Sequence, residues 1–477
     1  MRARLSASGT ALVWLTLTAE TIRALAAPAL VEPPRRTSFL DGRVRFTVPD
    51  KPYVVLRYGP LEAVVVDNRA VDDEVLPGHR AGYHGLGSRK HEKQRRNRFE
   101  PSYAGLNFEL IHDGTVQDNK ILGELLAPFF QPPPELAGKF GAYRSPLIFE
   151  DGTPVRSAAD WPRRREEIAK QWTGLMGPWP AVIERPNLEV LSETHRDNFA
   201  QRRVRLETAP NQTGEGWLLV PDGSGPFPAV LVVYYEPETS VGLSTNTLRD
   251  FGYQLARRGL VTLNIGTPGG NARQPETGTA QCQPLSFHAY VAANCWHALA
   301  NLPEVDRARI GVVGHSYGGK WALFAAALWD KFACVAVSDP GIVFDETRPN
   351  VNYWEPWYLG FDPARKRPKA GLPTADNPRT GAYEKMIATG RDLHELHALI
   401  APRPFLVSGG SEDPPERWTA LNHALAVNKL LGFTNRVAMT SRPGHTPTEE
   451  SNAQLYAFFE HFLADRSSLN KKKQTAR

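Results

Sequence analysis

A serine stands on a short, glycine-flanked turn in the second half of the chain. The turn reads Gly314-His315-Ser316-Tyr317-Gly318, after the apolar run 310–313 and before the helix-like run 320–325. A serine between a strand and a helix has a strained backbone, and it needs small neighbours because the two elements approach closely. The turn exposes the hydroxyl and directs the helix N-terminus at developing negative charge. This pattern predicts Ser316 as a nucleophile.

A serine nucleophile requires a base and a group that orients the base, and candidates for both follow downstream. The strand-like run 405–408 leads into a loop with two carboxylates, Glu412 and Asp413, and the run 437–440 leads into a loop with His445. Loops that follow parallel strands meet at one edge of a sheet, where ligands bind. We therefore expect His445 as the general base and Asp413 as the orienting acid, with Glu412 as the alternative.

Acyl transfer also requires two N–H donors for the oxyanion. One is expected from Tyr317, directly after the nucleophile, and the other from the loop after residues 230–233. Counting from the end of that strand favours Glu236, with Tyr235 as the alternative.

An aromatic-rich excursion spans residues 341–390 and contains Trp354 and Trp357, while Trp418 follows the acid loop. Aromatic faces at a pocket rim suit sugars, so these three side chains are expected to bind substrate. The alternative is that they anchor a long loop to the sheet.

From about residue 158 onward, short apolar runs alternate with helix-like stretches, which predicts a parallel sheet with crossover helices. The expected strands are 229–235, 261–265, 309–314, 333–338, 404–408 and 436–440. The expected helices are 248–258, 286–302, 318–329, 416–431 and 449–464. The fold class is therefore α/β, with a catalytic domain over residues 158–465.

The rest of the chain has a different texture. Short β-branched runs, 52–58 and 61–66, predict a β-rich accessory region over 37–126, and the Pro- and Gly-rich stretch 127–157 predicts a linker. Residues 1–26 combine a basic start, a short apolar stretch and a small-x-small site, which predicts a signal peptide and a secreted or periplasmic protein. Residues 466–477 are expected to be a basic, solvated tail.

Composition excludes several classes of protein. The chain has 477 residues, of which 41% are hydrophobic and 22% charged, a profile typical of a globular protein. The net charge of +5 equals the charge of the last twelve residues alone, so the body offers no basic groove for nucleic acid. No apolar run is long enough for a stable membrane span. Of the three cysteines, Cys282 and Cys295 flank one loop and are candidates for a disulfide.

Two longer phrases carry a family resemblance. The run from Leu302 to Gly319, LPEVDRARIGVVGHSYGG, and the run 399–404, LIAPRP, resemble the α/β-hydrolases of the dienelactone hydrolase and acetyl xylan esterase kind. The resemblance covers about two-thirds of the chain and implies a triad of Ser316, Asp413 and His445. It implies no metal and no organic cofactor.

A narrower similarity is to glucuronoyl esterases, which carry Gly-x-Ser-Arg-x-Gly-Lys at the nucleophile. Gly314, Ser316, Gly319 and Lys320 match that pattern, whereas Tyr317 replaces the arginine that helps the oxyanion hole in that family. The match makes Lys320 a candidate substrate contact, with the alternative that it is only a helix residue at the pocket edge.

These observations predict a secreted serine esterase that acts on a small-molecule or polysaccharide ester, most simply an acylated carbohydrate. The alternatives are a glucuronoyl esterase, a serine peptidase of the same fold, and a non-catalytic binding protein. The oligomeric state is left open by the sequence.

Overall fold

The structure is a computed structural model. It describes residues 122–348, 358–365 and 371–463, and the backbone alone of residues 2–6, 12–16, 30–31, 53–58, 61–66 and 107–108. The chain divides into two compact units, Met1–Asp118 and Asn119–Arg477.

The first unit contains short strands in two small sheets. One joins β1 (Arg2–Ser6), β2 (Leu12–Thr16) and β6 (Asn107–Phe108), and the other joins β3 (Leu30–Val31), β4 (Tyr53–Tyr58) and β5 (Leu61–Val66). The antiparallel pair β4–β5 coincides with the two β-branched runs of the sequence. The leader over residues 1–26 and the accessory role of this unit remain predictions.

The second unit is built on one nine-stranded sheet with the order β15-β14-β13-β12-β10-β11-β9-β8-β7. Its parallel part consists of β10 (Phe227–Val233), β11 (Val261–Ile265), β12 (Val305–His315), β13 (Val335–Ser338), β14 (Phe405–Gly409) and β15 (Val437–Ser441). An antiparallel extension follows, with β7 (Leu188–Arg196), β8 (Phe199–Ala209) and β9 (Gln212–Pro221). The expected parallel sheet is therefore confirmed, and the extension was not predicted.

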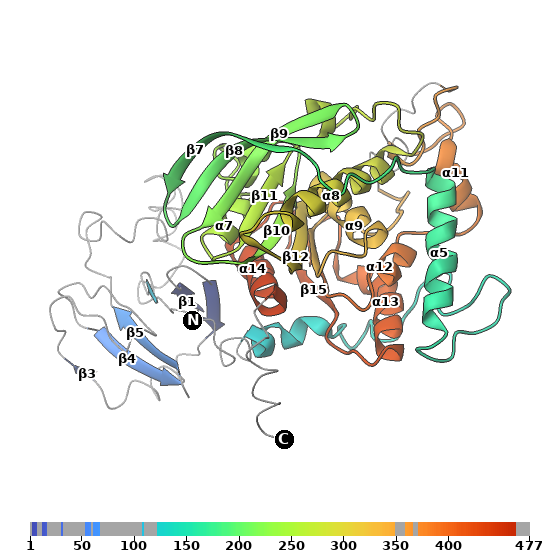
Figure 1. Cartoon of the computed structure of the whole chain (residues 1–477). Coiled ribbons are helices and arrows are strands. Elements are labelled where there is room, and N and C mark those ends of the chain that lie inside the picture. The colour runs from blue at the N-terminus through green and yellow to red at the C-terminus, as the bar shows by residue number, and fades with distance from the viewer. Residues whose placement is uncertain are drawn as a thin grey trace, which may run out of the picture. The chain divides into compact units, whose positions relative to one another are not determined.

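Helices cover both faces of this sheet (Figure 1). One layer contains α5 (Trp161–Met176), α8 (Pro284–Ala300), α9 (Tyr317–Leu328), α12 (His394–Ile400) and α13 (Trp418–Leu430). The other contains α7 (Phe251–Ala256) and α14 (Glu449–Leu463). Two short helices, α6 (Pro237–Ser240) and α11 (Gly381–Ala388), lie in the connections. The central strands are buried on both faces, which explains their continuous apolar runs.

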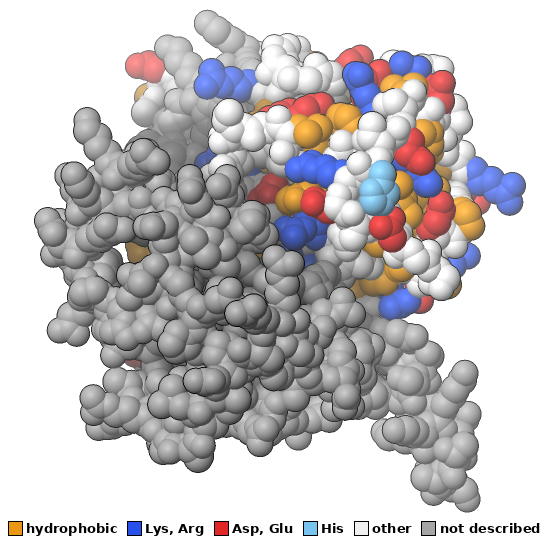
Figure 2. Space-filling model, turned by 90° about the vertical axis from the view of Figure 1, so that its left-hand side faces the viewer, with side chains coloured by type: hydrophobic (Ala, Val, Ile, Leu, Met, Phe, Trp, Pro, Cys, Tyr) orange, Lys and Arg blue, Asp and Glu red, His pale blue; other side chains and the backbone are white. Residues whose placement is uncertain are grey.

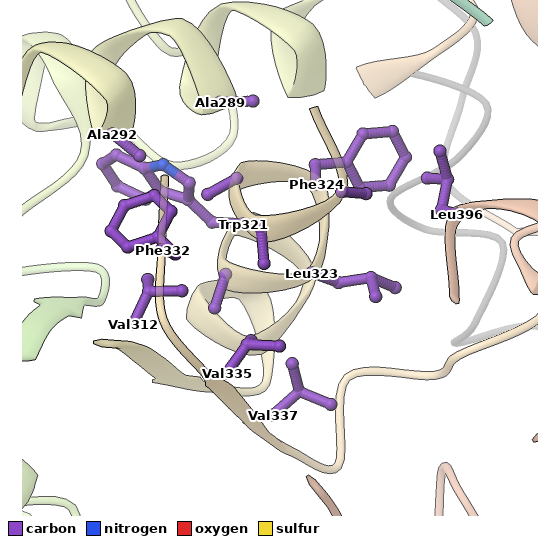
Figure 3. Close-up of a cluster of buried hydrophobic side chains, with 14 of the residues drawn as sticks. Ala289, Ala292, Val312, Trp321, Leu323, Phe324, Phe332, Val335, Val337 and Leu396 are labelled. Atoms are coloured by element: carbon purple, nitrogen blue, oxygen red, sulfur yellow. The ribbon is translucent and has the colours of Figure 1, made fainter. Parts of the chain in front are cut away.

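The larger core centres on α9, which is almost entirely apolar because it is covered on every side, with Lys320 as its one charged residue. Trp321, fully buried, lies among Ala292 of α8, Val312 of β12 and Phe332, as Figure 3 shows. Its indole N–H donates a hydrogen bond to the carbonyl of His288 at 2.6 Å. The helix that begins at the nucleophile is thus held by packing along its whole length.

The stretch 127–157, which the sequence predicts as a linker, packs on the second unit instead. Phe130 belongs to the core beside α14, and the carbonyl oxygens of Leu136 and Lys139 accept hydrogen bonds from the Asn422 amide at 2.8 Å. Glu150 forms an ion pair with the buried Arg164 of α5 at 2.9 Å. The prolines and glycines of this stretch therefore indicate irregular backbone, and the stretch is packed against the core instead of forming a free linker.

The antiparallel extension carries alternating charges on its exposed strands. Arg202 pairs with Glu193 at 2.6 Å, Arg203 with Glu215 at 2.6 Å and Arg205 with Glu189 at 3.1 Å. On the face drawn in Figure 2, acidic and basic side chains of the described residues are interspersed rather than sorted by sign.

The three cysteines are free and buried. Cys282 lies two residues before α8 and Cys295 lies in its fourth turn, so the axial rise of about 1.5 Å per residue separates them far beyond bonding distance. The question of a Cys282–Cys295 disulfide, which the sequence leaves open, is therefore answered: the two cysteines are not paired in the structure.

The packing around α9 predicts a large loss of stability on truncation. Trp321→Ala should lower the free energy of unfolding by about 3–5 kcal/mol, because it opens a cavity in a closed core. Val190→Ala, at a side chain 49% exposed on β7, should change it by less than about 0.5 kcal/mol. Urea denaturation followed by circular dichroism measures both, and equal effects would contradict the assigned core.

Candidate active site

The serine turn has the strained geometry expected of a nucleophile. Ser316 lies between β12 and α9 with φ 55° and ψ −121°, in a region that L residues rarely adopt. Its N–H donates to the carbonyl of Ser338 at 2.8 Å, which ties the turn to the end of β13. Backbone of this kind costs about 1–3 kcal/mol and persists where the surroundings restrain it.

Glycines on both sides make this turn possible. A Cβ added at Gly314 would lie 2.1 Å from the carbonyl oxygen of Gly318, and one at Gly318 would lie 2.1 Å from the carbonyl oxygen of Val233. Either contact is far shorter than atoms tolerate. The glycines therefore allow β12, α9 and the end of β10 to meet.

His445 lies between the serine and a carboxylate. Its Nε2 is 2.9 Å from Ser316 Oγ, and its Nδ1 is 2.8 Å from Oδ2 of Asp339. With Nδ1–H donating to the buried carboxylate, Nε2 is left as the acceptor for the serine hydroxyl. This is the hydrogen-bonded arrangement of nucleophile, base and orienting acid.

The carboxylate at His445 is Asp339, not Asp413, and this corrects the expected triad. Asp413 is also fully buried, but its Oδ2 and Oδ1 accept hydrogen bonds from the N–H groups of Gly341 and Ile342 at 2.8 and 2.6 Å. The physical reason is strand order: β13 borders β12 directly, whereas β14 is one strand further away. The alternative, Glu412, pairs with Arg348 at 3.1 Å.

Asp339 is held by backbone donors from the loop after β14. Its carboxylate accepts the N–H of Asp413 at 2.8 Å and that of Glu412 at 3.1 Å. A Cβ at Gly410 would lie 2.6 Å from Oδ2, so only glycine leaves room for the carboxylate there. The loop that was expected to supply the acid therefore supplies the donors that orient it.

The segments expected to hold the oxyanion are adjacent. Tyr317 is the first residue of α9, and Glu236 caps α6 with an extended backbone (φ −137°, ψ 144°). A Cβ on Gly318 would lie 3.2 Å from Cα of Tyr234, so the end of β10 packs on the first turn of α9. The carbonyl of Tyr235 accepts the N–H of Thr267 at 3.0 Å. Assignment of the two donors remains a prediction.

The Tyr317 side chain lies in the interior. Its hydroxyl bonds to Nε2 of His288, whose Nδ1–H donates to the Pro284 carbonyl at 2.6 Å. Burial lowers the pKa of His288 to about 4 and raises that of Tyr317. The imidazole is therefore neutral, and its Nε2 accepts a hydrogen bond from the Tyr317 hydroxyl. At the position where glucuronoyl esterases carry an arginine, this chain has Tyr317, and its side chain links α9 to His288 of α8.

Two of the expected substrate contacts lie inside the protein. Lys320 is 1% exposed, and its Nζ donates to the Gly341 carbonyl rather than lining a pocket edge. Trp418 is 2% exposed and belongs to the core, because α13 packs against α12. Trp354 and Trp357 lie outside the described residues.

Arg442 is a residue that sequence reasoning missed. Its guanidinium donates to the Ser408 carbonyl at 2.8 Å, to Ser338 Oγ at 3.2 Å and to the His445 carbonyl at 2.7 Å. It thereby joins the ends of two strands to the histidine loop. The signal available in the sequence was an arginine three positions before the histidine, in Arg442-Pro443-Gly444-His445.

Two further groups flank His445. The ring of His315 lies 4.7 Å from that of His445, and burial holds the pKa of His315 well below its usual value, which keeps that ring neutral. Arg249 donates from Nη2 to Thr446 Oγ1 at 3.5 Å, and its buried Nε has no partner among the described residues. The guanidinium also forms a hydrogen bond with the Tyr234 side chain, which leaves its Nε–H as the donor without a partner in the described part of the chain. Within the same part of the chain, no group of three His, Cys, Asp or Glu residues is placed to hold a metal ion.

Comparison with known proteins identifies relatives for this unit. Residues 191–344 match the family model "Esterase FrsA-like". The 4-O-methyl-glucuronoyl methylesterase 1 of Wolfiporia cocos is 24% identical over 358 residues, which cover 68% of this chain and 81% of that protein. The enzyme of the same name from Phanerochaete chrysosporium is 26% identical over 359 residues, covering 68% and 70%.

Solved structures give the same picture of the fold. A glucuronoyl esterase from Solibacter usitatus superposes with a TM-score of 0.54 at 18% identity, over 69% of this chain and 100% of that one. A promiscuous CE15 esterase from a marine bacterial metagenome gives a TM-score of 0.53 at 17% identity, over 69% and 98%.

The geometry predicts which carboxylate supports turnover. Asp339→Asn should lower kcat on an aryl acetate by about 10³–10⁴-fold, because an amide at this position favours the wrong tautomer of His445. Glu416→Gln, at an exposed carboxylate of the loop after β14, should leave kcat within about twofold. Steady-state kinetics of the purified full chain measures both, and near-normal kcat for Asp339→Asn would remove Asp339 from the triad.

The nine-stranded sheet, its two helical layers and the serine turn on β12 agree with the fold of these relatives. The sequence relatives are carboxylic ester hydrolases by name. The chain is thus an enzyme of the α/β-hydrolase fold, in the carboxylic ester hydrolase class.

Proposed function

We propose that this enzyme is a serine carbohydrate esterase in which Ser316, His445 and Asp339 act together. The observation that carries the proposal is the position of His445, which lies 2.9 Å from the serine hydroxyl and 2.8 Å from a buried carboxylate. A serine with a base and an oriented acid performs acyl transfer.

In this mechanism, His445 Nε2 takes the Ser316 proton as Oγ attacks the ester carbonyl. The tetrahedral oxyanion is stabilised by the N–H of Tyr317 and by that of Glu236, with Tyr235 as the alternative second donor. Collapse expels the alcohol, which takes the proton from His445, and leaves an acyl-enzyme. Water, deprotonated by the same histidine, then releases the acid. Each step uses groups of the chain and water alone.

The substrate class that the comparisons favour is an ester of a uronic acid, rather than the acetylated carbohydrate of the first expectation. The two fungal relatives are named glucuronoyl methylesterases and the Solibacter usitatus structure is a glucuronoyl esterase, whereas the metagenomic structure is described as a promiscuous CE15 esterase. Their low identity to this chain makes the uronate a proposal. Tyr317 in place of the family arginine is the point at which the chain departs from that pattern.

Arg249 supports the uronate reading. Its guanidinium lies beside the histidine loop with a buried, unused Nε–H. Hydrolysis of a uronate ester creates a carboxylate, and a guanidinium N–H forms a strong, charge-assisted hydrogen bond with a carboxylate. We therefore assign Arg249 to the acid portion of the substrate.

Two alternatives from the sequence, a serine peptidase and a non-catalytic binding protein, make different demands on the site. A peptidase requires cleavage of an amide by the same triad, and a binding protein requires a displaced triad member, whereas all three groups here are in hydrogen-bonding contact. Secretion through a leader at residues 1–26 remains a prediction. Among the described helices, none is both long and apolar enough to cross a membrane.

The proposal predicts a sharp dependence on Ser316 and on the acid portion of the ester. Ser316→Ala should reduce turnover by about 10³-fold or more on every ester. Wild-type kcat/KM should be highest for a methyl or benzyl ester of glucuronic acid, compared with acetylated xylose, an aliphatic ester and a peptide amide. Preference for acetylated xylose would restore the acetyl esterase reading, and undiminished turnover by Ser316→Ala would end the mechanism.

Arg249 has its own test in product inhibition. Arg249→Gln should weaken competitive inhibition by free glucuronate about 10-fold or more, since a hydrogen bond to a charged group is lost. Arg257→Gln, which removes a guanidinium stacked near Tyr253 on α7, is the matched control and should leave the inhibition constant unchanged. Equal inhibition constants for wild type and Arg249→Gln would show that Arg249 does not bind the acid portion of the substrate.

A further inference from the structure

The turn that carries Asp339 is strained at two positions. Asp339 has φ 52° and Gly341 has φ 77°, both in the left-handed region. An aspartate in that region persists only where neighbouring groups over-determine the backbone. Restraints on this turn must therefore come from the residues packed around it.

Asp413 supplies the first restraint. Its two carboxylate oxygens accept the N–H groups of the strained Gly341 and of the next residue, Ile342, at 2.8 and 2.6 Å. Hydrogen bonds to a carboxylate are stronger than neutral ones. The side chain is fully buried, so no water competes for these donors.

Lys320 supplies the second restraint from the first turn of α9. Its buried Nζ donates to the carbonyl oxygen of Gly341. The same residue, Gly341, is thus held at its N–H by Asp413 and at its carbonyl by Lys320. A Cβ at neighbouring Gly319 would lie 3.0 Å from Cβ of Pro340, so α9 also packs directly on the turn.

The backbone of Asp413 also bonds directly to the Asp339 carboxylate. The Asp413 N–H donates to Asp339 Oδ1 at 2.8 Å, while Asp339 Oδ2 lies 2.8 Å from His445 Nδ1. Asp413 therefore fixes both the backbone that carries Asp339 and one oxygen of its carboxylate, and leaves the other oxygen for the histidine.

We propose that Asp413 and Lys320 are positioning residues that hold the Asp339 turn, and through it His445, in the geometry needed for proton transfer. This inference rests on the proposed Ser316–His445–Asp339 mechanism and assigns no direct contact with substrate to either side chain. It gives Lys320 a role in turnover instead of substrate binding.

The charges around Asp413 make its contacts with the Asp339 turn sensitive to pH. The Asp339 carboxylate lies on one side, Arg417 Nε is 4.0 Å away, and Arg442 also acts electrostatically on Asp413. Burial, followed by the charge of Asp339, raises the pKa of Asp413 to about 6. Above that pH the ionised carboxylate holds both N–H groups and adds negative charge near the His445 imidazolium. Both effects weaken as pH falls through 6.

The test compares four forms of the full chain on an aryl acetate, a substrate chosen so that the outcome is independent of the uronate assignment. These forms are wild type, Asp413→Asn, Lys320→Met and the exposed-carboxylate control Glu416→Gln. Asp413→Asn and Lys320→Met should each lower kcat about 10–100-fold, the cost of a small misplacement, with KM within about threefold. Glu416→Gln should match wild type.

Two readouts separate positioning from general destabilisation. The acid limb of the pH–kcat/KM profile should move to lower pH in Asp413→Asn, because a titrating carboxylate near the imidazolium is removed. In an Asp339→Asn background, adding Asp413→Asn should lower kcat further by less than about threefold, because its effect acts through Asp339. Should Asp413→Asn fail to unfold cooperatively, Lys320→Met carries the same kcat expectation.

The proposed positioning role would be wrong if both single variants kept the wild-type kcat, or if only KM changed. Full additivity of Asp339→Asn and Asp413→Asn would also contradict it. Failure of the mechanism itself looks different: Ser316→Ala would then retain turnover of the aryl acetate, whatever the Asp413 and Lys320 variants do.

Discussion

The hydrogen bond from the Ser316 N–H to the Ser338 carbonyl fixes the relation between the two segments that carry the chemistry. It extends the ladder in which His315 of β12 pairs with Ser338 of β13. Because these parallel strands are adjacent and end in register, the next residue on each, Ser316 and Asp339, leaves the sheet at the same level. His445, from the loop after β15, then bridges two groups whose spacing the sheet has already set.

The sharp turns with which the chain leaves the sheet at Ser316 and Asp339 strain the backbone. Nearby glycines and a buried charged side chain make these turns possible. Ser316 and Asp339 both have left-handed backbone, with φ values of 55° and 52°. Gly314, Gly318 and Gly410 remove the side chains that would otherwise collide at these turns. The buried guanidinium of Arg442 joins the strand ends to the histidine loop, so the strained turns are enclosed by groups that cannot move independently.

Much of this arrangement was accessible from local sequence pattern. The strand 261–265 was predicted to the residue, and the serine turn was recognised because its glycines, strand and helix are contiguous. The acid was assigned wrongly because the choice between Asp339 and Asp413 depends on strand order, which one sequence does not reveal. Both aspartates follow buried strands, and only the sheet shows which strand borders β12. Trp418 was misjudged for a related reason, since burial of a helix face depends on its neighbours.

The three buried cysteines have a consequence for the chemistry of maturation. The thiolate is the species that reacts in disulfide exchange and oxidation, and burial disfavours it. Burial raises the pKa of Cys282 to about 11 and raises those of Cys295 and Cys334 as well. None of the three is paired, so the native fold gains no stability from a cross-link and loses none to a reductant. The unit therefore reaches this structure without forming a disulfide, and its assembly needs neither an oxidant nor a disulfide isomerase.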